Sequence, residues 1–109
     1  MANFNRELGM VATDDGVELE TRPEHEVMPG TIHFAVLATL VEVSAAQAAN
    51  RSVVPTNVNL SLMRRAVAGK LVAKGRVLKA GRTLIFAEGE VYQDDKLVAK
   101  AAVTFAVMA

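Results

Sequence analysis

Apolar and polar residues alternate along the second half of the chain, and this alternation predicts a series of β-strands. A period of two sends successive side chains to opposite faces of a sheet. We expect four antiparallel strands, over residues 53–64, 69–79, 83–92 and 97–107. The segments Ala80-Gly81-Arg82 and Gln93-Asp94-Asp95-Lys96 are typical of the turns between such strands.

The alternation also predicts which side chains share a face. In the first of these strands, one face carries Val54, Val58, Leu60 and Leu62, and the other carries Asn57, Asn59 and Ser61. In the second, Leu71, Ala73 and Val77 lie opposite Lys70, Lys74 and Arg76. In the last, the apolar face carries Leu97, Ala99, Ala101, Val103, Phe105 and Val107.

The first half of the chain predicts one long helix after two short strands. Residues 8–13 and 17–22 are typical of strands joined by a tight turn at Asp14-Asp15-Gly16, and Pro23 and the Pro29-Gly30 pair mark the irregular segment that follows. Residues 31–49 contain six alanines and no Gly or Pro, which favours a helix. The order β-β-α-β-β-β-β predicts an α+β fold in which an antiparallel sheet wraps around one long central helix.

Composition limits the classes of function. A chain of 109 residues and 11.6 kDa is expected to form one domain, 1–109. It has no cysteine and two histidines, so we expect no disulfide and no metal site. The start of the chain lacks a signal-peptide pattern and no long uncharged apolar run is present, so a cytoplasmic protein without a membrane partner is expected. Its 51% hydrophobic content indicates a buried subunit interface.

The net charge of zero hides a segregation of charge along the chain. Residues 1–42 hold eight acids and two bases, residues 43–87 hold eight bases and no acid, and residues 88–109 hold four acids and two bases. The basic segment indicates a phosphate-bearing partner, or else solvated strand faces that pair with acids elsewhere. A nucleic-acid partner is not expected, because the pI is near neutral and few aromatic residues are available for stacking.

Glu42 is the single formal charge between Val27 and Asn50. A carboxylate within an apolar helix is costly to bury, and such groups often mark functional sites. Its helical neighbours, one turn before and after, carry no charge, so an ordinary solvated face is the weaker interpretation.

His33 lies at the predicted helix start, where backbone N–H groups lack internal acceptors and can stabilise an oxyanion. The nine residues between His33 and Glu42 span about 13 Å of helix, too far for both to contact one reacting atom. If both act, one must come from a second subunit, as in a dimer with antiparallel helices.

These features resemble the hotdog-fold acyl-CoA thioesterases of the phenylacetate-degradation type. That family carries a stretch like H-x-N/Q-x-x-G-x-x-H-G-G, followed by an acid nine residues after the second histidine. Here the corresponding stretch runs from His25 through Gly30 and His33 to Ala35, and the acid is Glu42. The resemblance continues through Asn59–Arg64, Gly69–Ala73, Gly81–Leu84 and Lys96–Ala99, and so covers residues 8–107.

The resemblance implies a hotdog fold and the hydrolysis of an acyl-CoA. Glu42 would be the catalytic carboxylate, as nucleophile or as general base. The backbone N–H of Phe34 would polarise the thioester carbonyl, and His33 would shape that turn. Arg64, Arg65 and Arg82 would bind coenzyme A phosphates, with coenzyme A as part of the substrate and no separate cofactor. A homodimer, or a tetramer of two dimers, would complete the site. The acyl chain would be held by apolar walls, with Met28, Ile32, Phe34, Val58 and Leu60 as candidates.

The sequence departs from this pattern at three positions. The Gly-Gly pair is Phe34-Ala35, the expected amide side chain is Val27, and a hydroxyl one turn after the acid is Ala46. These departures leave open a non-catalytic or weakly active acyl-CoA-binding homo-oligomer. A hydratase of the same fold is disfavoured because no close His–acid pair is present, and a purely structural oligomer is a further alternative.

Overall fold

The computed structural model describes residues 1–108 and contains two α-helices and eight strands. In chain order the elements are α1 (Asn3–Glu7), β1 (Val11–Ala12), β2 (Val17–Glu20), a 3-10 turn (Pro23–His25), β3 (Glu26–Met28), β4 (Thr31–Ile32), α2 (Phe34–Ala49), β5 (Val53–Leu62), β6 (Lys70–Ala80), β7 (Leu84–Gln93) and β8 (Lys96–Val107). Neither helix in this part of the chain has the length and apolarity needed to cross a membrane.

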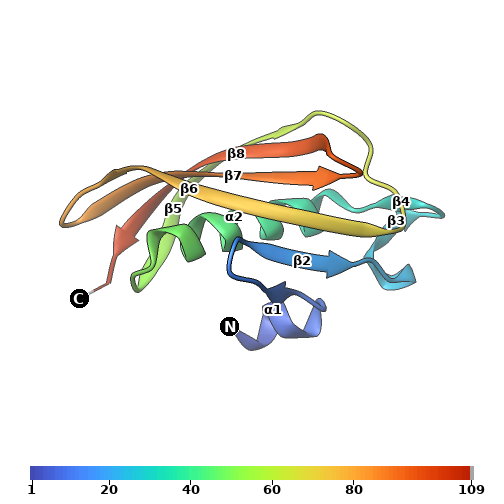
Figure 1. The fold of residues 1–109 in the computed structure, drawn as a ribbon, viewed down its shortest axis with the longest axis horizontal. Coiled ribbons are helices and arrows are strands. Elements are labelled where there is room, and N and C mark those ends of the chain that lie inside the picture. The colour runs from blue at the N-terminus through green and yellow to red at the C-terminus, as the bar shows by residue number, and fades with distance from the viewer. Residues whose placement is uncertain (109) are drawn as a thin grey trace.

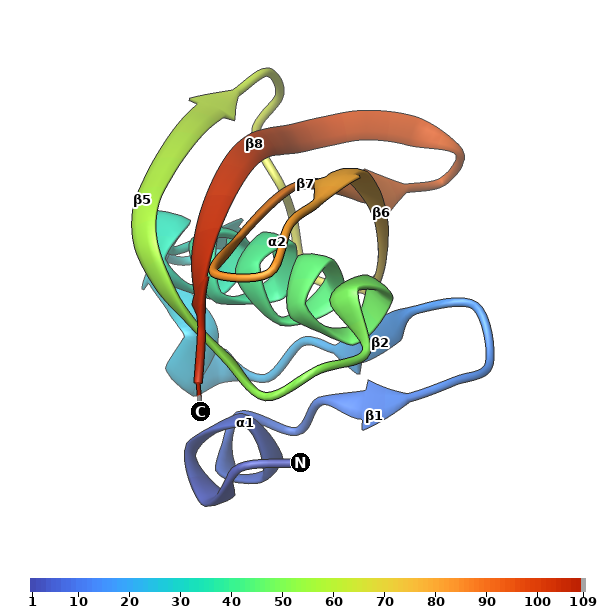
Figure 2. The same cartoon turned by 90° about the vertical axis from the view of Figure 1, so that its left-hand side faces the viewer.

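Six strands form one antiparallel sheet in the order β1-β2-β6-β7-β8-β5. Helix α2 lies along the concave face of this sheet (Figure 1), and a view near its axis shows the strands curling around it (Figure 2). Its closest packing is against β6 and β7. The arrangement confirms the α+β prediction of a sheet wrapped around one long helix.

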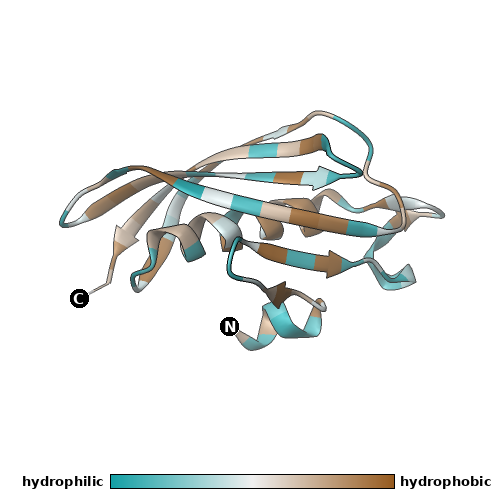
Figure 3. Ribbon diagram, in the orientation of Figure 1, coloured by the Kyte–Doolittle hydropathy of each residue, from teal (hydrophilic) through white to brown (hydrophobic). Residues whose placement is uncertain are grey.

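The core lies between α2 and the inner face of the sheet. Hydrophobic and hydrophilic positions are interspersed along β6 (Figure 3), where Leu71 and Ala73 are buried and Lys70 and Lys74 are exposed. Strands β7 and β8 likewise bury mainly one face. One side of α2 is buried, comprising Val36, Leu37, Leu40, Val41, Ser44 and Ala45. These residues meet the buried strand positions Leu71, Ala73, Ile85, Ala87, Val91, Ala99, Ala101, Val103 and Phe105. Most of the predicted apolar faces of residues 69–79 and 97–107 therefore lie in the core. Val77 is 37% exposed, and Leu97 lies opposite Tyr92 beyond a register shift, so Val98 is buried in its place.

The structure differs from the sequence prediction before α2. The expected irregular segment contains a hairpin, in which β3 pairs with β4 around Pro29-Gly30. Thr31 and Ile32 belong to this hairpin, so α2 begins at Phe34 and not at residue 31. The short helix α1 was not expected, and none of its residues is buried.

The predicted face of Val54 is wrong because a β-bulge interrupts β5. Val54 lies opposite Ala106, whereas Val58 lies opposite the buried Val103, and the register shifts between Pro55 and Asn57. An extra residue in one strand reverses the alternation from that point on. Val54 is therefore on the outer face of the sheet, away from Val58.

Strand β5 forms an open edge of the sheet. It pairs only with β8, and almost all of its residues are exposed. Val58 and Leu62 point to the inner side of the sheet, where α2 contributes little cover, and they are 42% and 53% exposed. An apolar edge strand of this length is uncommon on a monomer, because its free N–H and C=O groups are available to another strand.

Candidate functional site

The start of α2 is fixed by the hairpin that precedes it. The Gly30 N–H donates to Oε1 of Glu26 at 2.8 Å, which closes the hairpin turn, where Gly30 has a φ of +81°. The His33 N–H donates to the His25 carbonyl oxygen at 2.8 Å, and the Ile32 N–H donates to the Ala66 carbonyl oxygen at 2.9 Å. These bonds hold the residues just before the helix to two separate segments of the chain.

His33 is the N-cap of α2. Its Nδ1 accepts from the Ala35 N–H at 3.0 Å, and its carbonyl oxygen accepts from the Val36 N–H at 3.1 Å. The first-turn N–H groups of a helix have no partner inside the helix, so a capping side chain stabilises the end. The prediction that His33 shapes this turn agrees with its position.

The Phe34 N–H remains available at the helix start. It donates to no acceptor within residues 1–108, while the two N–H groups that follow it are both taken by His33. Phe34 is 55% exposed, and its ring stacks on the His33 ring, with centroids 4.9 Å apart. A free N–H at a helix N-terminus, where the helix dipole is positive, is suited to stabilise an oxyanion.

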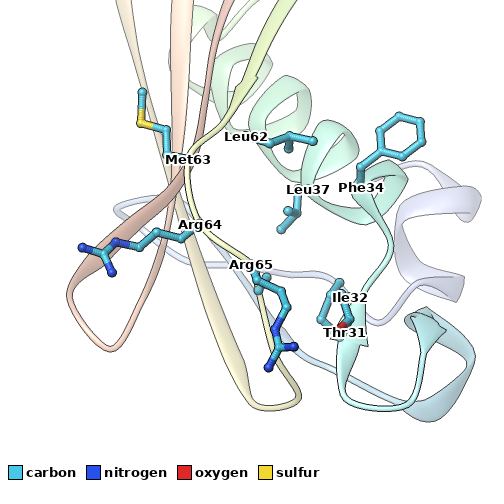
Figure 4. A pocket seen from close by; sticks show the side chains of 9 residues that line it. Thr31, Ile32, Phe34, Leu37, Leu62, Met63, Arg64 and Arg65 are labelled. Carbon is cyan, nitrogen blue, oxygen red and sulfur yellow. The ribbon is translucent and has the colours of Figure 1, made fainter.

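A cavity of about 310 Å³ adjoins Phe34. It lies between the start of α2 and the segment that follows β5, and its lining residues are Thr31, Ile32, Phe34, Leu37, Leu62, Met63, Arg64, Arg65 and Ala66. Figure 4 shows Leu62 and Arg65 on the side of Leu37, whereas Met63 and Arg64 point away from it. The structure thus brings three of the predicted site residues, Phe34, Arg64 and Arg65, to one cavity.

Of the apolar residues expected to hold the acyl chain, Ile32 and Phe34 line this cavity, whereas Met28, Val58 and Leu60 do not. Three further lining residues were not predicted: Leu37 from the buried side of α2, and Leu62 and Met63 from the end of β5. Helical spacing of three residues from Phe34 was the signal that could have identified Leu37.

Glu42 lies outside the cavity, on the side of α2 that the sheet leaves uncovered. This side also carries Ala35, Ala38, Thr39 and Ala46, all exposed or partly exposed. Glu42 is half-buried, and desolvation raises the pKa of its carboxyl above the usual 4.5. In the described part of the chain it forms no hydrogen bond or ion pair. Eight residues of helix separate it from Phe34, about 12 Å along the axis.

Arg82 is not part of this cavity. It lies in the turn between β6 and β7, at the end of the molecule opposite the start of α2 (Figure 1). A single chain therefore does not bring together all three predicted phosphate-binding arginines.

The basic segment divides into paired and unpaired cations. Lys70 forms an ion pair with Glu18 at 3.0 Å, and Arg76 pairs with Glu88. For these two cations, the interpretation as strand residues that pair with acids elsewhere in the fold is correct. Arg51 donates to the Gly81 carbonyl oxygen at 3.0 Å. Among residues 1–108 no acid pairs with Arg64, Arg65, Lys74, Lys79 or Arg82. Within residues 1–108, no three His, Asp or Glu side chains lie close enough together to bind a metal ion.

Comparisons with known proteins identify a family match and several similar structures. Residues 29–100 match the sequence model of the thioesterase superfamily. A phenylacetic acid degradation-related protein of Ralstonia eutropha, named as a candidate thioesterase, is 28% identical, with 98% of this chain and 91% of that chain covered and a TM-score of 0.85. A variant of the phenylacetic acid degradation protein PaaI of Thermus thermophilus is 25% identical, with 98% and 100% covered and a TM-score of 0.87.

A Bacillus halodurans protein solved with CoA shares the fold at 22% identity, with 99% of this chain and 80% of that chain covered and a TM-score of 0.89. A search of curated proteins found no match.

Proposed function

The chain belongs to the thioesterase superfamily, and we propose that it hydrolyses acyl-CoA thioesters at a site shared by two copies of the chain. Membership of this family confirms the hotdog fold and the assignment as a thioester hydrolase. It also confirms the resemblance to thioesterases of the phenylacetate-degradation type. The observation that carries the proposal is the free Phe34 N–H at the mouth of the cavity beside α2.

The Phe34 N–H would stabilise the charge that develops on the thioester oxygen. The helix dipole adds to its partial positive charge, and the bonds to His25 and Ala66 hold the turn before the substrate arrives. A donor already in place costs no reorganisation during the reaction, which is why such donors contribute strongly to catalysis.

Glu42 would supply the second part of the chemistry. As a general base it would take a proton from water, whose oxygen attacks the carbonyl carbon. As a nucleophile it would attack that carbon itself and form a mixed anhydride that water then cleaves. In both routes the bond from carbon to sulfur breaks, coenzyme A leaves as a thiolate that takes up a proton, and the acyl group leaves as a carboxylic acid. Partial desolvation makes the Glu42 carboxylate a stronger base.

A second copy of the chain would bring these two groups together. Within one chain they are about 12 Å apart along the helix axis, too far to contact one carbonyl group. The uncovered side of α2, with its small residues around Glu42, continues into the open apolar edge at β5. A two-fold dimer on this face, with antiparallel helices, would place each Glu42 beside the other chain's Phe34.

Coenzyme A would bind by its phosphates to the unpaired arginines. Arg64 and Arg65 adjoin the cavity, and Arg82 would approach it only from the second copy. Guanidinium groups without an acidic partner suit phosphate binding. The Bacillus halodurans structure shows that a protein with this fold accommodates CoA.

The proposal is tested by steady-state hydrolysis of a panel of acyl-CoAs. The wild type is expected to hydrolyse at least one of them, and Glu42→Gln is expected to lower kcat by about 10²–10⁴. Glu20→Gln, an exposed carboxylate on β2, is the matched control and should retain wild-type kcat. Equal rates for the wild type and Glu42→Gln would remove Glu42 from the chemistry.

Acyl-CoA binding without efficient turnover is the second candidate function. Phe34 adds a phenyl ring beside the N–H, and neither Val27 nor Ala46 offers a polar side chain to the site. Loss of one such assisting donor typically lowers the rate by about 10²–10³. Calorimetry that detects binding of acyl-CoAs, together with no hydrolysis across the panel, would favour this candidate.

A further inference from the structure

The Phe34 side chain lies beside any carbonyl that the Phe34 N–H binds. An N–H···O bond places the carbonyl oxygen about 2.9 Å from the nitrogen, and the ring is attached one carbon from the same Cα. Phe34 is more than half exposed as a residue. The ring is therefore an apolar surface at the reacting centre that its own chain does not cover.

The orientation of this ring is set by the residue that caps the helix. The ring stacks on His33 at an interplanar angle of 27°. His33 is itself held by the Ala35 N–H and by the bond from its own N–H to the His25 carbonyl oxygen. The ring therefore packs on a residue held by these two bonds, which gives the apolar wall a defined orientation.

The cavity beside Phe34 is open to solvent within one chain, so its apolar walls and not its volume would limit an acyl group. Leu37 and Leu62 line it between Phe34 and the segment that carries Arg65 (Figure 4). The Phe34 ring points away from Leu37 (Figure 4), so an acyl group that extends along the Phe34 side chain meets the ring within a few carbons, and one that extends into the cavity meets the two leucines.

We propose that Phe34 is a specificity-determining residue that restricts the substrate to acyl-CoAs with short acyl chains, from acetyl to butyryl. The proposal rests on the proposed function, because it assumes that the Phe34 N–H binds the thioester carbonyl. It assigns to the side chain a role separate from that of the backbone N–H, which every substitution except proline retains.

The test is the profile of kcat/KM against chain length, from acetyl-CoA to dodecanoyl-CoA. In the wild type, kcat/KM is expected to fall beyond butyryl-CoA. In Phe34→Ala it is expected to rise with chain length by about fourfold for each additional buried methylene. Phe34→Leu retains bulk and is expected to keep most of the short-chain preference. Phe86→Ala, which removes an exposed ring from the outer face of β7, is the matched control and should leave the profile unchanged.

Parallel profiles for the wild type and Phe34→Ala would overturn the proposal, as would a wild-type optimum at long chains. Thermal unfolding establishes that each variant is folded, and Phe34→Val, which also removes the ring, carries the comparison if the alanine variant is not. If the wild type hydrolyses no acyl-CoA, the proposed function fails. Calorimetry then still tests the chain-length restriction, because the wild type should bind short acyl-CoAs more tightly than long ones, and Phe34→Ala should reverse this order.

Discussion

Gly89 of β7 lies directly against the backbone of Val41 in α2. A Cβ at Gly89 would clash with the Val41 carbonyl oxygen and lie 2.9 Å from Ser44 Oγ. Gly75, which faces Gly89 across the β6–β7 ladder, makes a similar close approach to the Ser44 carbonyl oxygen. Because neither glycine has a side chain, α2 packs closely against the sheet at the helical turn that carries Glu42. The two glycines thereby determine the position of the proposed catalytic carboxylate.

Gly89→Ala is therefore expected to lower stability by about 1–3 kcal/mol, because the added methyl must push the helix away from the sheet. The free energy of unfolding in urea measures this change. Ala102→Ser, on the exposed outer face of β8, is the control and should stay within about 0.5 kcal/mol of the wild type. An unchanged urea midpoint for Gly89→Ala would show that the helix does not rest on the sheet at this point.

The role of the Phe34 N–H can be tested by removing it without removing the helix. Proline is favoured at the first position of a helix and has no N–H. His33 has a φ of −62° and a ψ of 138°, which is the conformation required before a proline. Phe34→Pro is expected to lower kcat by about 10²–10³, whereas Phe34→Ala retains the N–H and should still hydrolyse the best substrate. Equal kcat values for these two variants would exclude the N–H as the oxyanion donor.

Periodicity predicted the elements that build the core, but not those that build the site. The alternation in β6 and β8 identified their buried faces, because one side of each strand packs on α2. The start of α2 was misplaced because Thr31 and Ile32 pair in a hairpin around Pro29-Gly30, and nothing local in an alanine-rich segment marks that pairing. Val54 was misplaced because a bulge leaves no trace in an alternating pattern.

The predicted site residues are partly brought together by the fold. Phe34, Arg64 and Arg65 adjoin one cavity, although 30 residues of sequence separate the first from the second, and their roles in oxyanion stabilisation and phosphate binding stay predictions. The partners of the charged residues could not be predicted, because Glu18 reaches Lys70 only through the pairing of β2 with β6. The roles of Glu42, His33 and Arg82 remain predictions, since they depend on a second copy of the chain and on substrate.

Glu42 also predicts a pH dependence. Burial disfavours its charged form, so the pKa of the folded carboxyl lies above 4.5. The reaction needs the carboxylate, so kcat should fall as the pH drops through that raised pKa. The same shift affects the free energy of unfolding. Below pH 4.5 Glu42 is protonated in both states and has no such effect, whereas above its raised pKa the ionised carboxylate lowers stability. Glu42→Gln is thus expected to raise stability at neutral pH and to match the wild type in acid. An acid limb of kcat centred at or below 4.5 would contradict this.

The unpaired arginines predict a charge-dependent affinity for coenzyme A. Removal of one charge-assisted hydrogen bond lowers affinity by about 10- to 100-fold. Arg64→Ala and Arg65→Ala are expected to weaken binding by such a factor in calorimetry and to reduce its dependence on salt. Lys79→Ala removes an exposed cation from β6 with no acidic partner and serves as the charge-matched control. Equal losses for all three variants would mean that overall charge, and not the cavity, determines binding.

The most direct test of a site shared between two copies is a mixture of two inactive variants, Glu42→Ala and Phe34→Pro. In a mixed dimer, the Glu42 of one chain and the Phe34 N–H of the other form one intact site, while the second site lacks both groups. Equal mixing after subunit exchange should therefore restore hydrolysis to about a quarter of the wild-type kcat. Activity that stays at the level of the separate variants, although mass spectrometry detects the mixed dimer, would show that the two groups do not act across an interface.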